Sequence, residues 1–166
     1  MSIFKRIFGK DSELAKSKTP EVKRSKIEFA QLNYPPKILL AWVKAMEGNS
    51  DLGKFLLDNG YEELFYLTHA LQLKQEARDW LMKNGYPHLM AMVNAAEGNQ
   101  SALHWLEVHG FELLYHVADA VEGEMESFDW LKIHSSELIF GVTKTIKRMK
   151  DDIEFNHNDM HSFGRD

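Results

Sequence analysis

A large aromatic residue followed by leucine recurs every 25 residues along this chain, and no insertion interrupts the spacing. The four pairs are Phe55-Leu56, Trp80-Leu81, Trp105-Leu106 and Trp130-Leu131. A fixed period of this length is typical of a stack of like units, each of which buries its apolar face against its neighbours. The chain is therefore predicted to be a repeat protein, and stacked units build surfaces that hold something.

A second set of periodic positions predicts the first helix of each repeat. Three rows of residues, each with the 25-residue period, lie three positions apart and so share one helical face. Glycine follows this helix in three repeats, where a left-handed residue ends a helix at least cost. Leu73 interrupts that glycine series, so we expect the second repeat to turn differently. The rows are Leu39, Leu64, Leu89, Leu114 and Ile139; Trp42, Leu67, Met92, Val117 and Val142; and Ala45, Ala70, Ala95, Ala120 and Thr145, and the glycines are Gly48, Gly98 and Gly123.

The second helix of each repeat carries the aromatic-leucine pair and ends at Gly60, Gly85 and Gly110. The runs Asn49-Ser50 and Asn99-Gln100-Ser101 offer amide or hydroxyl caps for its N-terminus. Helices this short are marginal alone in water, so stacking must hold them. The predicted fold is all-α: an α-solenoid of about four 25-residue helix-turn-helix repeats, plus a capping helix at about 137–150. A compact helical bundle whose repeats are remnants of duplication is the alternative.

Three segments divide the chain: a basic amphipathic leader and linker (1–34), the α-helical repeat domain (35–150) and a polar tail (151–166). In the repeat domain the three tryptophans and four leucines are expected to form a stacked core. On that view Trp105→Ala removes a core side chain and costs about 3–5 kcal/mol. The chain has no cysteine, which excludes disulfides, thiolate metal sites and a cysteine nucleophile.

Charge is divided along the chain. Residues 1–26 hold eight Lys and Arg against three acidic residues, whereas the whole chain has a formal net charge of −5. The repeat region therefore carries the acid, which disfavours nucleic acid as its ligand and favours a protein partner with a basic segment. The alternative is that the acidic residues only keep a helical surface soluble.

The first ten residues have an amphipathic pattern. Ile3, Phe4, Ile7 and Phe8 share one helical face, and Lys5, Arg6 and Lys10 surround it. Three interpretations stay open for this segment: packing on the repeats or fraying, docking into a groove of a partner, and contact with an anionic membrane surface. Residues 11–33 are predicted to be a polar linker.

Two rows on the first helices vary from repeat to repeat while the core rows do not. They are Ala41, Tyr66, Ala91, His116 and Gly141, and Lys44, His69, Asn94, Asp119 and Lys144. A repeat protein that recognises a partner keeps its core residue types from repeat to repeat and changes its surface residue types. A solvent-exposed face with no binding role shows the same variation. We predict that Tyr66, His69, Asn94, His116 and Asp119 contact the partner, with tyrosine as an anchor because it buries a large rigid ring and keeps a polar tip.

The run Ala95 to Phe111 resembles the helix-turn-helix half of an ankyrin repeat. It has an alanine pair, a glycine turn, and a second helix that closes with His109-Gly110. The match extends loosely over residues 38–147. The period of 25 instead of 33, the absent Thr-Pro-Leu-His opening and the lack of room for a β-hairpin are departures from that family. The resemblance implies a binding scaffold of short helix pairs and names no partner.

Catalytic patterns are scarce. His157 and His161 are four residues apart, but they lie in a polar tail in which no regular helix is expected, so we predict no metal site and no cofactor. His109 and His134 fit as cations at helix C-termini. Lys144, Lys147, Arg148 and Lys150 are assigned in the same way to the end of the last helix.

The sequence therefore predicts a non-catalytic, cytoplasmic protein-protein interaction module. An immunity or inhibitor-type protein that neutralises a basic enzyme is the alternative, and an enzyme with a site between helices is the second alternative.

Overall fold

The computed structural model describes residues 31–162 of the chain, with side chains up to residue 159, and has nine helices and no strand within that range. Four helices form an inner layer: α3 (Pro36–Met46), α5 (Glu62–Leu71), α7 (Pro87–Ala96) and α9 (Glu112–Glu122). Each is followed by an outer helix: α4 (Ser50–Asp58), α6 (Gln75–Lys83), α8 (Gln100–Val108) and α10 (Met125–His134). The last helix is α11 (Glu137–Ser162). The prediction of an all-α fold with four helix pairs and a fifth, terminal helix is confirmed.

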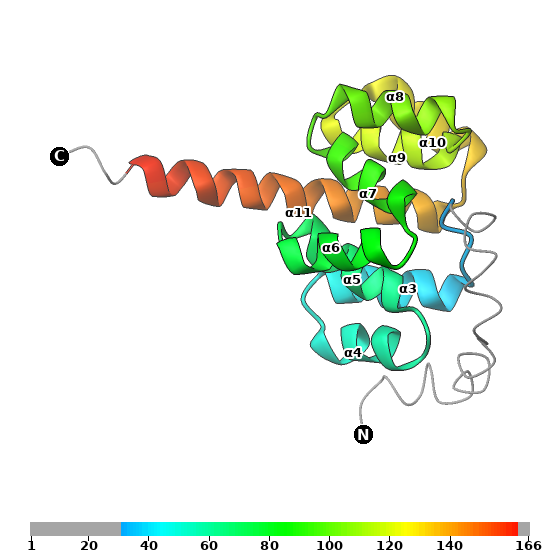
Figure 1. Cartoon of the computed structure of the whole chain (residues 1–166). Helices are drawn as coiled ribbons and strands as arrows, with labels where there is room; N and C mark the ends of the chain where they lie inside the picture. Colours follow the sequence, from blue (N-terminus) through cyan, green and yellow to red (C-terminus); the bar gives the residue numbers. More distant parts are fainter. Residues whose placement is uncertain (1–30, 163–166) are drawn as a thin grey trace.

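The inner helices pack in chain order, α3 on α5, α5 on α7 and α7 on α9, as in a solenoid. Each outer helix packs between its own inner helix and the next one. Helix α11 contacts both α9 and α3, so it closes the inner layer by joining its two ends (Figure 1). The stack curves so strongly that one long helix, α11, packs against the inner helices of both the first and the last repeat.

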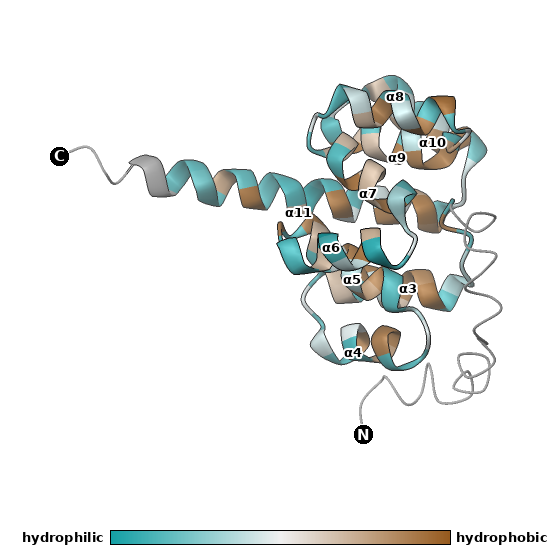
Figure 2. Cartoon of the chain, viewed as in Figure 1, coloured by the Kyte–Doolittle hydropathy of each residue, from teal (hydrophilic) through white to brown (hydrophobic). Residues whose placement is uncertain are grey.

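The core lies where the inner helices meet. Every residue of the three predicted core rows is buried, which confirms them. The leucines of the four repeating pairs, Leu56, Leu81, Leu106 and Leu131, have no exposed surface. Apolar residues gather between the helices, and the outer helices and the projecting half of α11 carry mostly polar residues with single exposed apolar side chains such as Ile133 and Phe155 (Figure 2). Burial of each such leucine contributes about 1.5–3 kcal/mol before conformational entropy is subtracted.

The tryptophans of the repeating pairs do not form the stacked core that the sequence suggested. Trp80, Trp105 and Trp130 are only partly buried and lie against the rim of the core, while Trp42 on α3 is fully buried. In the last three repeats the residue before the buried leucine stacks on a ring of its own or the next inner segment, whereas Phe55 at this position of the first repeat is buried. That prediction is therefore correct for the leucines and wrong for the three indoles.

The turns follow the glycine pattern. Gly48, Gly98 and Gly123 after inner helices and Gly60, Gly85 and Gly110 after outer helices all have positive φ. Leu73 also has positive φ, at 67°. The second repeat thus turns like the others, and the expectation of a different turn there was wrong. Asn49 and Asn99 accept the Leu52 and Ala102 backbone N–H groups at 3.0 Å, so caps form in both predicted runs and the amide supplies each of them.

The domain begins before the predicted boundary at residue 35. Leu32 is 2% exposed and belongs to the core. The Gln31 Oε1 atom accepts the backbone N–H of Leu113, in the first turn of α9, at 2.8 Å. The Tyr34 hydroxyl donates to Glu63 at 2.9 Å, and burial followed by the nearby Glu63 carboxylate raises the pKa of Tyr34. The chain therefore enters the fold at the N-terminal ends of the inner helices.

Helix α11 is longer than the sequence suggested. It was expected to end at about residue 150 and to be followed by a polar tail without regular helix, but it continues to Ser162. Lys144, Lys147, Arg148 and Lys150 consequently lie in mid-helix and not at a helix C-terminus, so the dipole role assigned to them was wrong. None of the described helices combines the length and apolar composition that crossing a membrane requires.

Candidate binding groove beside α11

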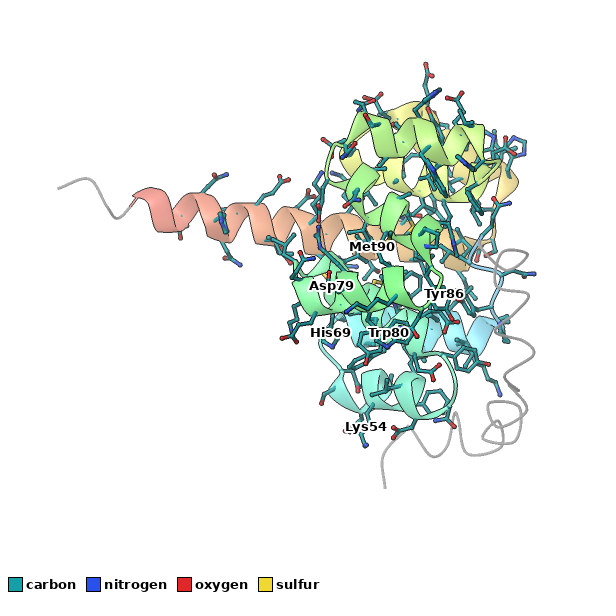
Figure 3. The ribbon with its side chains drawn as sticks, viewed as in Figure 1. Lys54, His69, Asp79, Trp80, Tyr86 and Met90 are labelled. Carbon is teal, nitrogen blue, oxygen red and sulfur yellow. The ribbon has the colours of Figure 1, made fainter. Side chains whose placement is uncertain are left out.

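Two of the residues predicted to bind a partner lie against tryptophans of their own repeats. The Tyr66 ring stacks on Trp80 with 4.0 Å between centroids, and the His116 ring stacks on Trp130 at the same separation. Trp80 also stacks on Tyr86 at 5.8 Å (Figure 3). The varying row of the inner helices thus meets the tryptophan position of the outer helices. Where that row carries alanine, at Ala91, Trp105 stacks instead on His109 of its own helix, at 4.0 Å.

His116 and Asp119 are joined through Ser127 on α10. The Ser127 hydroxyl donates to Asp119 at 2.6 Å, and His116 Nδ1 lies 2.9 Å from the same oxygen. Since the hydroxyl has one proton, His116 must donate from Nδ1. Burial, the largest influence, lowers the pKa of His116. Ser127 is buried and lies between the other two, whereas a nucleophilic triad needs histidine in the middle. These two hydrogen bonds connect α9 to α10.

His69 and Asn94 belong to the second varying row, the one that also contains Asp119. His69 lines a cavity of about 200 Å³ between α3, α4 and α5, with Phe65 and Gln72 beside it. Its Nδ1 atom is 3.1 Å from the Gln72 side-chain oxygen, and its ring meets the edge of Phe65. Asn94 uses its backbone carbonyl to accept the Asn99 N–H at 3.0 Å. Tyr66 and His69 both contact Phe65, and His116 and Asp119 both contact Ser127. The role of the five predicted residues in binding stays a prediction.

A larger groove lies beside α11, at the C-terminal ends of α5, α7 and α9. Its volume is about 420 Å³. One wall is the face of α11 from Ile146 to Asn158, and the other is formed by the last residues of the three inner helices. We call it the α11 groove. Its apolar lining consists of Leu71, Leu73, Ala96, Val121, Ile146, Met149 and Ile153.

Leu73 differs from the other apolar lining residues in its backbone conformation and in the exposure of its side chain. Its backbone is in the left-handed region, which costs a residue with a Cβ atom about 1–2 kcal/mol. Its side chain is 50% exposed and borders the groove. Neither the backbone strain nor the exposure of a large apolar side chain stabilises the fold.

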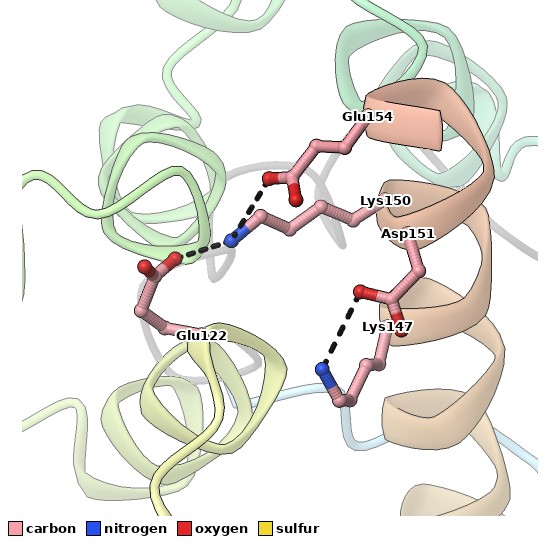
Figure 4. A network of polar contacts seen from close by, with 5 residues as sticks. All are labelled: Glu122, Lys147, Lys150, Asp151 and Glu154. Atoms are coloured by element: carbon pink, nitrogen blue, oxygen red, sulfur yellow. Dashed lines mark hydrogen bonds and ion pairs between the residues drawn. The ribbon is translucent and has the colours of Figure 1, made fainter. Parts of the chain in front are cut away.

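Ion pairs between helices border the groove. Arg78 on α6 forms a two-pronged pair with Glu97 at the end of α7 and donates to the Ala70 carbonyl at 3.1 Å. On the other side, Lys150 of α11 pairs with Glu122, the last residue of α9, and lies 3.8 Å from Glu154 (Figure 4). The Arg78–Glu97 pair joins α6 to the end of α7, and the Lys150–Glu122 pair joins α11 to the end of α9.

The groove has a negative electrostatic environment even where its carboxylates are paired. Leu71, Ala96 and Val121 stand at the C-terminal ends of α5, α7 and α9, so the three helices point the same way toward it. Each helix C-terminus carries roughly half a negative charge. Residues 31–159 also hold twenty acidic against eleven basic side chains. The site therefore combines an apolar floor with the negative ends of three helices and with charged side chains that are paired.

Sequence reasoning missed this groove because it assigned residues 151–166 to a tail. One signal was present in the sequence: Leu73 occupies a position that is glycine in three other repeats. A second was the row Glu47, Gln72, Glu97 and Glu122, which places polar residues at the ends of the inner helices. Neither signal locates the groove without the course of α11.

Among the residues that the structure describes, no group of three His, Cys, Asp or Glu side chains is arranged to hold a metal ion. His161, one of the two tail histidines considered from the sequence, has its side chain outside the described part. Comparison of the chain with family models, with curated proteins and with solved structures gave no match.

Proposed function

We propose that this chain is a non-catalytic protein-binding module that holds a helical segment of a partner in the α11 groove. The observation that carries this proposal is Leu73, a half-exposed leucine kept in a strained backbone conformation on the groove wall. A strained, exposed leucine lowers the stability of the fold, and contact of its side chain with a bound partner explains why leucine stands at this position. The resemblance to the helix pairs of ankyrin repeats supports the same class of function.

The partner segment has an apolar face with cationic residues beside it. An apolar helix face docked in an apolar groove is a common mode of peptide recognition. Cations beside that face lie near the negative ends of the inner helices and compete with Arg78 and Lys150 for Glu97 and Glu154. The acidic surface steers such a partner toward the chain and disfavours nucleic acid. A cytoplasmic location stays a prediction from the sequence.

Binding of synthetic helices to the full-length chain tests the proposal. The probe is a fluorescent peptide of about four helical turns with leucines on one face and lysines on the other. Two peptides serve as controls, one with the same composition in scrambled order and one with glutamate in place of lysine. Fluorescence anisotropy should show that the Leu/Lys helix binds at least about tenfold more tightly than either control, a difference of about 1.4 kcal/mol.

A matched pair of substitutions locates the site. Ile153→Asp puts a charge in the groove, and Ile133→Asp makes the same change on α10 at a side chain that is 76% exposed and not part of the groove. We expect about a tenfold loss of probe affinity for the first and no change for the second. Equal binding of the scrambled peptide, or equal effects of both substitutions, would contradict the proposal.

The inhibitor or immunity-type function is the second candidate, and the excess of acidic residues favours it. It differs from the first in having one tight partner, a basic enzyme, that binds across the outer acidic surface. Its association rate would fall steeply as ionic strength rises, because exposed charges steer the encounter. Capture in the groove depends more on apolar contact, so Ile153→Asp separates the two functions.

A further inference from the structure

The chain contains a segment with the chemistry that the α11 groove requires. Residues 1–10 carry Ile3, Phe4, Ile7 and Phe8 at positions that share one helical face, with Lys5, Arg6 and Lys10 around it. These ten residues lie outside the part that the structure describes. Their sequence nevertheless has the pattern of an amphipathic basic helix, which is the class of ligand argued above.

The length of the connection permits this segment to reach the groove of its own molecule. The chain enters the fold at Gln31, which is held at the N-terminal end of α9. The groove lies at the opposite end of the inner helices, and helices of 10 or 11 residues are about 15 Å long. The twenty residues from 11 to 30 span at most about 65 Å when extended.

The covalent connection favours binding of residues 1–10 in the α11 groove over binding of a free peptide of the same sequence. A segment joined to its binding site by a connection of this length reaches an effective concentration in the millimolar range when the span fits. Even a modest intrinsic affinity then fills the site. The charges also match, since Lys5, Arg6 and Lys10 would lie near the negative C-terminal ends of three inner helices and near Glu97 and Glu154, which pair with Arg78 and Lys150 in the structure.

We propose that residues 1–10 occupy the α11 groove of their own chain and that a partner binds by displacing them. This inference rests on the proposed function, because it assigns an internal competitor to the same groove. It makes the segment a brake on partner binding, which only a ligand of higher effective affinity releases.

Engineered cysteines test this contact directly in the full-length chain, which has no cysteine of its own. One variant combines Ser2→Cys with Asn158→Cys, at a groove-lining position. Its matched control combines Ser2→Cys with Ser101→Cys, which is exposed on α8 in the outer layer. Under mild oxidation at low protein concentration, the first pair should form an intramolecular disulfide about tenfold faster than the control pair.

Phe4→Asp with Phe8→Asp, added to the first variant, should lower its rate of disulfide formation to that of the control. The same double substitution in the cysteine-free chain should tighten binding of the Leu/Lys probe helix severalfold, because the competitor is removed. Circular dichroism checks that helical content is unchanged. Equal rates for the two cysteine pairs, disulfides only between molecules, or insensitivity to the Phe4 and Phe8 changes would overturn the proposal.

The two proposals fail in different ways. If the probe binds in the groove but the cysteine pairs react equally, the groove is a binding site and residues 1–10 are not its occupant. If the first cysteine pair reacts rapidly but no probe helix binds, even to the Phe4 and Phe8 variant, the groove holds its own segment and does not serve a partner.

Discussion

Leu73 occupies, with a φ of 67°, the turn position that Gly98 occupies one repeat later with a φ of 88°. The two residues end equivalent inner helices, α5 and α7, and their backbone N–H groups make equivalent bonds, from Leu73 to Ala70 and from Gly98 to Ala95, at 3.1 and 3.0 Å. The turn is therefore set by the stacking of the repeats and not by the residue at that position. Leucine is retained in a conformation that glycine adopts at no steric cost.

Exchange of these residue types between repeats should move stability in opposite directions. Leu73→Gly relieves a left-handed strain of about 1–2 kcal/mol and loses up to about 1 kcal/mol to the greater entropy of the unfolded chain. We expect its free energy of unfolding to be unchanged or about 1 kcal/mol higher. Gly48→Leu, at a φ of 100° with open space around it, should be about 1–2 kcal/mol less stable. Urea denaturation measures both.

The same pair tests the role of the groove. Leu73→Gly removes apolar surface from the groove wall, so it should weaken binding of the Leu/Lys probe helix although the fold is no less stable. Gly48→Leu leaves the groove lining intact and should leave affinity unchanged. A Leu73→Gly variant that loses more than about 1 kcal/mol of stability would assign Leu73 to the core and remove the argument for strain.

A missing helix cap in the second repeat offers a route to higher stability. Asn49 and Asn99 cap α4 and α8 with their side chains, and Lys74 occupies the equivalent place before α6 with no side-chain cap bond. The backbone is already suitable, because Lys74 has φ −82° and ψ 113° and Asn99 has −75° and 102°. Lys74→Asn should therefore raise the free energy of unfolding by about 0.5–1 kcal/mol.

Asn99→Ala is the matched control for the capping prediction. It removes a cap bond of the same geometry and should lower the free energy of unfolding by about 1 kcal/mol. Chemical denaturation of both variants beside the parent chain supplies the comparison. A Lys74→Asn variant no more stable than the parent, together with a destabilised Asn99→Ala variant, would mean that the cap does not form in the second repeat.

The 25-residue period was sufficient to predict the helix pairs, because a helix pair cannot bury its apolar face without a neighbour. The glycines and asparagines marked the helix ends, because turns and caps depend on the residues at those positions and not on distant packing. The closure of α11 onto α3 was not predictable in this way. It depends on the curvature of the stack, which arises from small packing offsets at every interface that no single residue determines.

The candidate site was harder to predict than the fold. The varying row that contains Tyr66 and His116 was interpreted as a recognition surface, and the structure places both rings against tryptophans of the outer helices. Packing therefore explains the residue types at these positions, because each ring stacks on the tryptophan of its own repeat. Helix propensity failed at α11, where residues such as Asn156 and Asp159 favour turns but continue a helix already formed by its packed first half.

The repeating aromatic-leucine pair divides into two structural roles, and substitutions should separate them. Leu106 has no exposed surface, so Leu106→Ala should cost about 2–5 kcal/mol. Trp105 is partly buried and stacks on His109 and Phe111, so Trp105→Ala should cost less than its leucine neighbour, in contrast to the 3–5 kcal/mol of a core tryptophan. Denaturation midpoints of the two variants give the order, and a larger loss for Trp105→Ala would return the indole to the core.

His116 should make stability depend on pH below neutrality. Its folded-state pKa is lowered from 6.5 chiefly by burial, against the carboxylates of Glu112 and Asp119, which act to raise it, while His134 lowers it further. The unfolded chain therefore binds a proton at a higher pH than the folded one. The sign of the linkage follows: stability is full above pH 6.5 and is lost as pH falls through the lowered folded pKa.

His116→Gln should reduce this loss, because glutamine has no proton to bind. His104→Gln is the control, since His104 is largely exposed on α8 and pairs only with Glu107 of its own helix. Urea denaturation at pH 7.5 and at pH 5.5 gives the change in free energy of unfolding for each chain. We expect the decrease between the two pH values to be smaller for His116→Gln than for the parent and equal to the parent for His104→Gln. If the stability of His116→Gln decreases as much as that of the parent, the ring stacked on Trp130 does not contribute to the pH dependence.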